Sequence, residues 1–538
     1  MTRQHAHRFA ATLLAALVAG CGGSNDDDSP PAPTRFTLEE ATVDDITAAT
    51  RTGLVTSERL VGLYLSRIEA YDRAGPRLGS TLHVNQNALA TARALDNTAP
   101  MGPLHGIPVL LKDNIDTVDM PTTAGSVALA GTVPAADAFI VGKLKRAGAV
   151  ILGKAQLTEF ANFMTNGMPA GYSSLGGWAL NPYDPRPLPG GDGRPVLTPG
   201  GSSAGAGIAT AANLTALSIG TETSGSILSP ASANGIVGIK PTVGLVSRSG
   251  ILPITADQDT AGPMTRTVRD AAILLGVIAG HDPADEATRA CLAPNQCHSD
   301  YVRFLDANAL MGARILVPPF PDNRAGIMEA AIAVLQSKGA TVARQATALP
   351  AVTAPGILNY GFKRDLNAYL ATRPASTRVR NLADIIAFNA ATPGATRYGQ
   401  TTLVASQALS LDPASADTAT YVQNRDAGFA ASRQTLTAAL NGPDGAAGTP
   451  DDFDALLFSG NSGAGIPARA GFPSIVVPGG VVPPADPVVN AIPSGVTFSG
   501  RAFSEPRLIA LAYAYEQATK LRRPPASTPP LPGETVTR

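Results

Sequence analysis

Short apolar runs alternate with stretches of helical periodicity along most of the chain after residue 35. A helix is expected to begin at Thr56 or Ser57, because apolar residues recur at helical spacing behind a residue type that caps helices. Brief apolar runs between turn residues predict buried strands. The expected helices cover 56–71, 139–146, 268–278, a segment from 325, and 505–521; the expected strands cover 109–111, 149–152, 314–318, a segment near 341, 453–458 and 475–477.

This alternation of strands and helices is typical of an α/β fold with a largely buried sheet. No internal repeat is visible, which argues against a solenoid or a propeller. Two segments, 181–199 with its prolines and 441–452, are expected to be loops. Carboxylates in or beside the second loop suggest calcium, but their spacing is not that of a helix-loop-helix site, so a solvated loop is favoured. They are Asp444, Asp451, Asp452 and Asp454.

Composition narrows the class of protein. The 538 residues include 41 Lys and Arg against 42 Asp and Glu, for a formal net charge of −1. Charged residues make up 15%, below the roughly 25% usual for soluble domains, while hydrophobic residues reach an ordinary 44%. With 54 Gly and 45 Pro, the chain also stays below the roughly 25–30% that signals low complexity, so disorder, collagen and coiled coil are excluded. The near-zero net charge gives no electrostatic footprint for nucleic acid.

The N-terminus carries the features of an export signal. Arg3 and Arg8 precede an apolar run over 9–19, too short to span a membrane, which takes about 20 residues. The run leads into Val-Ala-Gly before Cys21, which resembles the lipobox of bacterial lipoproteins, where the cysteine is acylated and the chain is cut before it. The alternative is a plain signal peptide with an incidental cysteine.

The lipobox interpretation divides the N-terminal region. We expect a lipoprotein signal peptide over 1–20, lipidation at Cys21 and a polar, proline-rich tether over 21–35. The protein would then be exported and held by its lipid at the periplasmic face of the cell envelope. Because Gly22 rather than an aspartate follows the cysteine, the outer membrane is favoured.

Two further cysteines, Cys291 and Cys297, lie six positions apart in a polar stretch. An exported chain meets an oxidising compartment, so a disulfide between them is expected, with two free thiols as the alternative. His298 is adjacent, but two cysteines and one histidine in a row lack the spacing of a zinc site. We therefore expect no metal.

The chemistry is concentrated in residues 198–241, a segment rich in Gly, Ser and Thr and poor in charge. Such segments let backbone N–H groups point at a ligand, and the phosphate-loop pattern is absent, which leaves acyl transfer with a serine nucleophile. One mechanism uses Ser203 in a G-x-S-x-G elbow. That mechanism needs a later histidine, and only His281 and His298 follow.

The second mechanism replaces histidine with a lysine base, which must be neutral and therefore desolvated. Lys112 suits that role because it follows an apolar run directly, so its stem should enter the core. The alternative is a structural lysine paired with Asp113 or Asp116 at the end of a strand. The residues alone leave these two possibilities open.

Seven motifs resemble those of the amidase signature family, and the resemblance covers about residues 36–525. They read GIPVLLKDNID (106–116), LGKAQLTEFANF (152–163), GYSSLGGWALNPYD (171–184), PGGSSAGAGIA (199–209), GTETSGSILSPASANGIVGIKPTVGLVSRSGI (220–251), DQDTAGPMTRTVRDAA (257–272) and FPSIVVPGG (472–480).

The resemblance implies one catalytic domain over 36–525, with an α/β fold built on a mixed, twisted sheet of about eleven strands flanked by helices, a size that sheets of large α/β enzymes reach. The residues beyond it, 526–538, are expected to form a flexible tail. No metal or organic cofactor is implied. The family's Ser-cisSer-Lys triad corresponds to Ser226 as nucleophile, Ser202 as relay and Lys112 as base, and the oxyanion would face the backbone N–H groups of Thr223, Ser224, Gly225 and Ser226.

Other polar residues near these motifs carry weaker expectations. Lys154 and Lys240 lie in family motifs at positions that the family does not use as base, so pairing with backbone or carboxylate is expected. Glu222 is expected to have a structural role near the nucleophile loop. Ser224 and Leu228 stand where members often carry Asp and Arg, which leaves substrate preference open. Three residues are candidates for the pocket wall, although the last could equally be packing: Asn114, Tyr172 and Trp178.

The expected function is an exported amidase that hydrolyses small carboxamides or peptide C-terminal amides, with such an amide and the membrane as its partners. One alternative is a protein like the amidase component of a tRNA-dependent amidotransferase, which the export signal contradicts. Another is a substrate-binding lipoprotein without catalysis, which would not need Lys112, Ser202 and Ser226 together. No pattern in 317–440, the expected source of the pocket walls, identifies the substrate.

Overall fold

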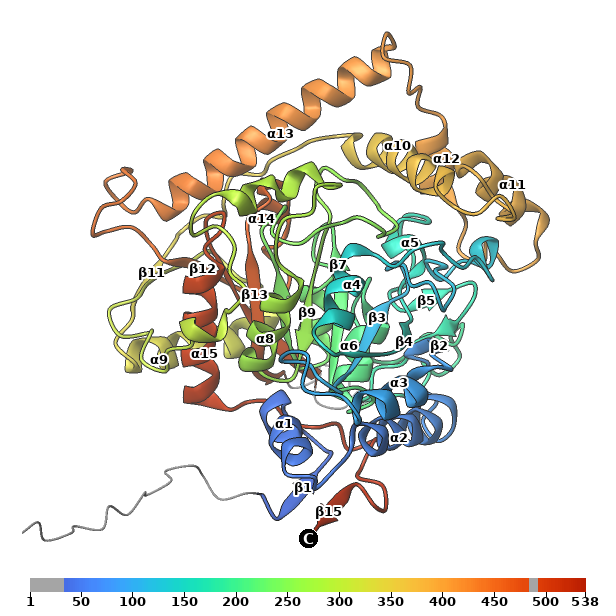
Figure 1. Ribbon diagram of the computed structural model, residues 1–538. Coiled ribbons are helices and arrows are strands. Elements are labelled where there is room, and N and C mark those ends of the chain that lie inside the picture. The colour runs from blue at the N-terminus through green and yellow to red at the C-terminus, as the bar shows by residue number, and fades with distance from the viewer. Residues whose placement is uncertain (1–32, 483–491) are drawn as a thin grey trace, which may run out of the picture.

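The computed structural model describes residues 33–482 and 492–538. Its centre is a sheet of eleven strands flanked by helices (Figure 1), which confirms the α/β fold and the mixed sheet expected from the sequence. The strand order is β11-β10-β12-β14-β13-β8-β9-β7-β3-β4-β2. The strands are β2 (Thr81–Val84), β3 (Pro108–Lys112), β4 (Val150–Ala155), β7 (Leu217–Glu222), β8 (Val237–Lys240), β9 (Thr260–Thr265), β10 (Arg314–Val317), β11 (Thr341–Arg344), β12 (Ala455–Ser459), β13 (Ser474–Val482) and β14 (Ile492–Ser499).

The five helices that the periodicity predicts, α2, α4, α8, α9 and α15, are present at or near the expected bounds, and the other helices were not predicted. The Thr56 side chain caps α2 by accepting a hydrogen bond from the N–H of Arg59. The α-helices are α1 (Val43–Arg51), α2 (Ser57–Arg67), α3 (Ala88–Leu95), α4 (Phe139–Arg146), α5 (Glu159–Asn162), α6 (Ala204–Ala211), α7 (Leu228–Ala233), α8 (Val268–Ile278), α9 (Ala325–Ser337), α10 (Ile357–Ala371), α11 (Leu382–Ala391), α12 (Thr401–Gln407), α13 (Ala416–Leu440), α14 (Gly465–Ala470) and α15 (Glu505–Thr519).

Helices α10 to α13 form a layer across the upper end of the sheet (Figure 1). This layer is the region in which the sequence shows no interpretable pattern. The long helix α13 buries a narrow stripe in which Gly428 and Ser432 interrupt the apolar residues Tyr421, Leu436 and Leu440. Helix α10 is attached by a separate apolar cluster in which Phe362 packs against Phe160 and Phe163.

The sheet brings Lys112 to the place where the chemistry is expected. Strand β3 lies between β4 and β7, parallel to both, and its apolar residues are fully buried. Because the carboxyl ends of parallel strands meet at one edge of a sheet, Lys112 at the end of β3 lies beside Thr221 near the end of β7. The lysine is itself completely buried.

The C-terminal residues 526–538 are packed against the domain, so the expected flexible tail is a wrong prediction. Strand β15 (Thr535–Thr537) pairs antiparallel with β1 (Arg35–Thr37). The Glu534 carboxylate contacts the fully buried guanidinium of Arg67 at 2.9 Å. Leaving that buried charge unpaired would be costly, which is the physical reason that the tail is held.

The predicted signal peptide, Cys21 and most of the tether lie outside the described residues. Within the described ranges, no helix combines the length and apolar character needed to cross a bilayer.

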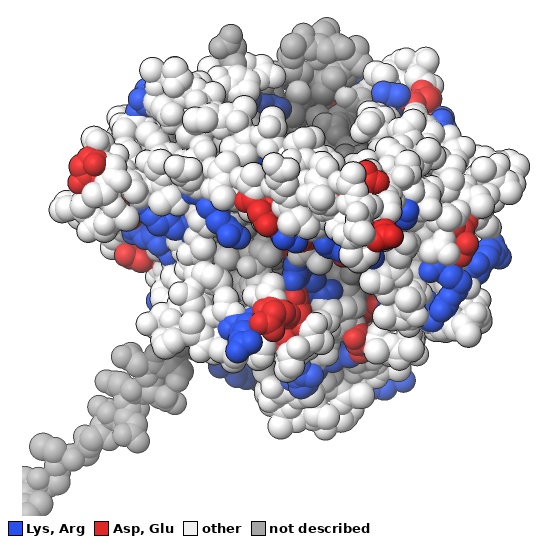
Figure 2. All heavy atoms as spheres, turned by 90° about the horizontal axis from the view of Figure 1, so that it is seen from above, with Lys and Arg blue, Asp and Glu red and all other residues white. Residues whose placement is uncertain are grey.

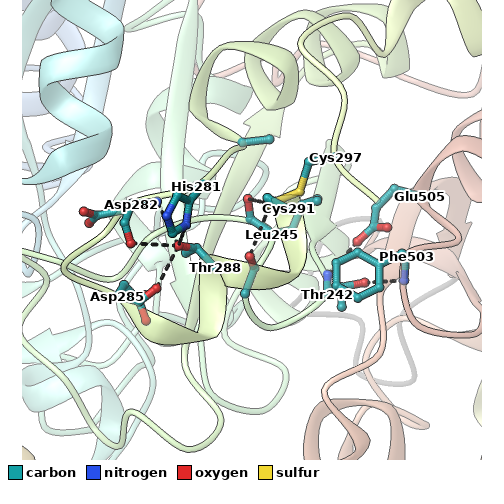
Figure 3. Close-up of a disulfide and its surroundings, with 12 residues drawn as sticks. Thr242, Leu245, His281, Asp282, Asp285, Thr288, Cys291, Cys297, Phe503 and Glu505 are labelled. Atoms are coloured by element: carbon teal, nitrogen blue, oxygen red, sulfur yellow. Dashed lines mark hydrogen bonds between the residues drawn. A yellow bond between two sulfur atoms is a disulfide. The ribbon is translucent and has the colours of Figure 1, made fainter. Parts of the chain in front are cut away.

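Cys291 and Cys297, which were expected to pair, are joined by a disulfide in the structure. The bridge closes the short segment that follows the 3-10 turn Glu286–Leu292 (Figure 3). His281 lies near this segment and hydrogen bonds to Thr288 rather than to a sulfur atom.

Candidate active site

Lys112 and Ser202 are in direct contact at the carboxyl edge of the sheet. The Nζ atom of Lys112 donates a hydrogen bond to Ser202 Oγ at 2.8 Å, and both side chains are fully buried. Thr221 contributes two further acceptors to the same nitrogen, its carbonyl at 3.1 Å and its Oγ1 at 2.9 Å. Every contact of the ammonium is therefore with an uncharged oxygen.

This environment favours the neutral form of the lysine. Burial lowers the pKa of Lys112 to about 7, although the negative charges of Asp259 and Glu222 oppose the shift. Desolvation disfavours an ammonium, and hydroxyl and carbonyl partners compensate less than a carboxylate would. A buried lysine that titrates near neutral pH has the property that a general base requires.

Ser226 lies on the loop between β7 and α7 and reaches the surface of a pocket of about 320 Å³. Its exposed fraction is 8%, whereas Ser202 is completely buried. The backbone on both sides of Ser202 is attached to this loop and to α7: Ser203 N–H donates to Ser226 O at 3.1 Å, and Gly201 N–H donates to Ser229 Oγ in α7 at 3.4 Å. The peptide bond between Gly201 and Ser202 is cis. The three predicted triad residues thus occupy one site.

The Glu222 carboxylate organises the nucleophile loop. It accepts hydrogen bonds from the N–H groups of Gly225 and Ile227, both at 2.7 Å, and of Leu228 at 3.1 Å. The expected structural role of Glu222 agrees with these contacts. They also correct the expected oxyanion site, because the Gly225 N–H is already donated and does not face the pocket.

The N–H groups that remain for an oxyanion have no acceptor in the part of the chain that the structure describes. They belong to Thr223, Ser224 and Ser226, which all line the pocket. Unpaired N–H groups at a pocket wall beside a serine are the donor set that an oxyanion hole provides.

We expect Glu222→Gln to lower kcat/KM by about 10²-fold, the cost of misplacing oxyanion donors. The glutamine NH₂ group would face one of the three backbone donors and displace the loop. Glu505→Gln is the matched control, since Glu505 is equally buried and accepts from the Thr242 N–H, away from the pocket. Steady-state kinetics and melting temperatures of both variants test this. Full activity of Glu222→Gln with an unchanged melting temperature would contradict the assignment.

A second buried carboxylate, that of Asp259, ties the nucleophile loop to the neighbouring pocket wall. It accepts a hydrogen bond from the Thr223 hydroxyl, and from the N–H groups of Ile254 at 2.8 Å and Thr255 at 2.9 Å. Burial raises the pKa of Asp259 to about 7. Since Thr223 and Ile254 both line the pocket, Asp259 holds two of its walls together.

Ser203 does not have the surroundings of a nucleophile. Its side chain is fully buried, donates to Thr221 O at 3.1 Å and accepts from the Thr221 N–H at 3.3 Å. Among the described residues, neither candidate histidine hydrogen bonds to it: His281 pairs with Thr288 and His298 with Arg303. The G-x-S-x-G elbow therefore has no base.

The other lysines and acids have structural partners. Lys154 lies 3.2 Å from the carboxylate of Asp113, and Lys240 donates to Phe472 O at 2.7 Å, as expected for both. Asp116 pairs with Arg373 at 2.8 Å. The alternative in which Lys112 pairs with Asp113 or Asp116 is therefore not what the structure contains.

The residues proposed for the pocket wall lie elsewhere. Asn114 is buried behind Lys112 and donates to Thr221 Oγ1 at 3.1 Å. Tyr172, Trp178 and Tyr398 pack edge to face, at ring-centroid distances of 4.9 to 6.0 Å. These three rings pack against one another and do not line the pocket that contains Ser226.

One wall of the pocket that contains Ser226 is the turn 160–162, which the sequence analysis did not predict as part of the site. Phe160, Ala161 and Asn162 all have left-handed backbone, with φ of 48°, 54° and 71°. Non-glycine residues pay roughly 1–2 kcal/mol each for this conformation. Ala161 and Asn162 line the pocket. Backbone strain concentrated at a pocket is typical of functional sites.

Leu358 and Asn461 also reach the pocket, from segments distant in sequence. Leu358 comes from α10, where the sequence offers no signal. Asn461 follows strand β12 in a Gly/Ser-rich loop, and small residues directly after a predicted strand could have indicated it.

The carboxylates of the 441–452 loop are engaged by protein groups. Asp451 accepts from the Asp444 N–H at 3.0 Å and from the Thr449 hydroxyl at 2.6 Å, and Asp454 pairs with Arg507 at 2.9 Å. Within the described ranges, no group of three or more His, Cys, Asp or Glu is arranged to hold a metal ion.

Comparison with known proteins places this geometry in a family. The family model described as Amidase matches residues 59–444. A probable amidase of Arabidopsis thaliana is 39% identical over 512 residues, which cover 91% of this chain and 92% of the relative. A Glutamyl-tRNA(Gln) amidotransferase component of Streptomyces coelicolor is 43% identical, but over only 46% of this chain and 47% of its own.

Solved structures of amidases are also similar to this chain. The native peptide amidase from Stenotrophomonas maltophilia is 40% identical and superimposes with a TM-score of 0.78, over 91% of this chain and 99% of its own. An amidase family protein from Bacillus anthracis is 34% identical, with a TM-score of 0.80 over 91% and 92% of the two chains. The buried lysine and the two serines therefore lie in a fold shared with hydrolases of amide C–N bonds, and this chain belongs to the amidase family.

Proposed function

We propose that the protein is an exported amidase that cleaves carboxamides through an acyl-enzyme on Ser226, with Ser202 and Lys112 as its proton relay. The observation that carries this proposal is the 2.8 Å contact between Lys112 Nζ and Ser202 Oγ beneath the loop that presents Ser226 to a pocket. A lysine with its pKa lowered to about 7 is neutral in half of the molecules at that pH, so it can act as the base.

In this mechanism, neutral Lys112 takes the proton of the Ser202 hydroxyl while Ser202 takes that of Ser226. The Ser226 oxygen then attacks the amide carbon, and the negative charge on the carbonyl oxygen is stabilised by the unpaired N–H groups of the loop. The relay returns the proton to the leaving nitrogen, the C–N bond breaks and an ester on Ser226 remains. Water attacks the ester by the same proton path and releases the carboxylate.

We infer that peptide C-terminal amides and small aryl or aliphatic amides are the substrate class. The similarity to the Stenotrophomonas peptide amidase over 99% of that chain supports this inference. The amidotransferase component is similar in sequence over only 47% of its length, so the peptide amidase is the better guide to substrate class.

A panel of aryl, aliphatic and peptide amides, incubated with the purified protein, tests the proposal. We expect ammonia or amine release from at least one class, with equal release of carboxylate. A binding lipoprotein would retain an amide without turning it over. Ammonia release that depends on an added acceptor and partner proteins would favour the amidotransferase alternative.

For export, we expect Cys21 to be diacylated and the protein to fractionate with membranes, because an apolar signal ends in Val-Ala-Gly-Cys. Cys21→Ser should move the protein to the soluble periplasm or leave it unprocessed. Fractionation and intact mass of both forms provide the measurement. A freely soluble wild type cut at another position would refute lipidation.

A further inference from the structure

A second cavity, of about 540 Å³, lies beneath α13 and beside the end of α14, and it shares no lining residue with the catalytic pocket. In the view from above, Lys and Arg side chains gather beside a hollow that crosses this face (Figure 2). Thr242 and Phe503 form one wall, held together by a hydrogen bond from the Phe503 N–H to Thr242 Oγ1 at 2.8 Å (Figure 3). We call this space the α13 cavity.

Two of the charged groups that line the α13 cavity are already neutralised. Arg248 pairs with Asp285, and Asp257 contacts Arg364 at 3.0 Å. These pairs make the rest of the wall electrically balanced, so the net charge of the cavity depends on its other two arginines.

Arg433 and Arg469 line the cavity without any carboxylate partner among the described residues. Arg433 donates through Nε to Ala470 O at 3.1 Å, and Arg469 through Nη1 to Val352 O at 2.8 Å. The Nε atom of Arg469 is buried and has no acceptor. Burial lowers the pKa of Arg469 from its usual value, with no anion nearby to oppose the shift.

The rest of the cavity wall is largely apolar. Phe429 projects from α13 four residues before Arg433, on the same face of the helix, and Phe472 and Phe503 line the cavity as well. Guanidinium groups bind planar carboxylates through paired N–H donors, and aromatic walls bury an apolar body. Two unpaired arginines beside three phenylalanines therefore suit one ligand chemistry.

We propose that the α13 cavity is a second binding site, separate from the catalytic pocket, for a small organic carboxylate with an apolar or aromatic body. Its carboxylate lies against the free N–H groups of Arg433 and Arg469, and its body lies against the phenylalanine rings. The inference is independent of the proposed amidase mechanism, because none of these residues belongs to it.

Isothermal titration of the purified full-length protein with phenylacetate tests the site. We expect saturable binding that weakens at least about tenfold in the double variant Arg433→Gln/Arg469→Gln, since two charged hydrogen-bond donors are lost. Phenylethanol, which keeps the ring and lacks the charge, should not bind at this site, and inorganic phosphate should bind more weakly than phenylacetate. In the proposed reaction the catalytic pocket also binds carboxylate products. Only the part of the phenylacetate binding that is lost in the double variant is therefore assigned to the α13 cavity.

Two further variants separate a loss of the binding site from a loss of folding. Arg433→Glu changes an exposed side chain, so it should fold and also abolish this part of the binding. Arg344→Gln is the control and should bind normally, because Arg344 pairs with Glu329 of α9 and does not line the cavity. The activity of Arg433→Glu on an amide should be unchanged. Unaltered phenylacetate affinity in Arg433→Glu and in the double variant, or phosphate binding as tight as that of phenylacetate, would overturn the proposal.

Discussion

Replacing Ser226 by alanine is expected to lower kcat/KM by roughly 10⁴-fold or more, because it removes the atom that forms the acyl-enzyme. Ser202→Ala keeps that nucleophile but interrupts the contact with Lys112, and should cost about 10²–10⁴, the range of a lost general base. Ser203→Ala is the matched control on the neighbouring residue. Its hydroxyl bonds only to the backbone of Thr221, so it should lose about 1 kcal/mol of stability and little activity.

The measurement is kcat/KM of the three variants on one amide, together with intact mass after treatment with a fluorophosphonate. The adduct should map to Ser226 in the wild type and in Ser203→Ala. Residues of one relay act as a unit, so the losses of Ser202→Ala and Ser226→Ala should not add in the double variant. An adduct on Ser203, or an active Ser226→Ala protein, would exclude the assignment.

Removing the lysine base is expected to lower kcat/KM nearly as much as removing the nucleophile. Lys112→Arg keeps a cation and hydrogen-bond donors but cannot be deprotonated, since the arginine pKa exceeds 12. We expect it to lose about 10²–10⁴ in kcat/KM, as Lys112→Ala should. A purely structural lysine would be partly replaced by arginine, so substantial activity of Lys112→Arg would refute the role of base.

The pH profile gives an independent readout. The base works in its neutral form and its pKa is lowered to about 7, so kcat/KM should fall about tenfold per unit below pH 7 and level off above it. Burial also raises the pKa of Asp259 to about 7 and lowers the pKa of Lys240 to about 8, so the titration of either group could produce the same fall in kcat/KM. Asp259→Asn and Lys240→Met are therefore measured in parallel. The fall in kcat/KM should persist in both, and its disappearance in either would reassign it.

Several helices and strands were predictable because their bounds follow from local sequence patterns. The bounds expected for α4 and α8 agree with the structure, since each has an apolar face at helical spacing. Strand β3 was expected over 109–111 and ends at Lys112. The α10 to α13 layer was not predictable. The buried stripe of α13 contains Gly428 and Ser432 as well as Tyr421, Leu436 and Leu440, so its hydrophobic period is interrupted and hard to detect.

The sequence by itself determined the family and the α/β class and predicted the three triad residues, because these depend on short motifs whose spacing is visible in one dimension. It could not decide whether Lys112 forms an ion pair with Asp113 or Asp116. Only the tertiary structure decided that, by placing Thr221 and Ser202 around the ammonium and directing Asp113 and Asp116 to other cations.

The tertiary structure also shows that the Gly225 N–H is not available to an oxyanion and that the C-terminal residues pack against the domain. Both outcomes depend on which buried donor finds which carboxylate: Gly225 finds Glu222, and Arg67 finds Glu534. These partners are 3 and 467 residues apart in the chain. Buried polar groups must be hydrogen bonded, but the partner can be near or far in the chain, so sequence patterns indicate that a partner must exist while the fold alone selects it.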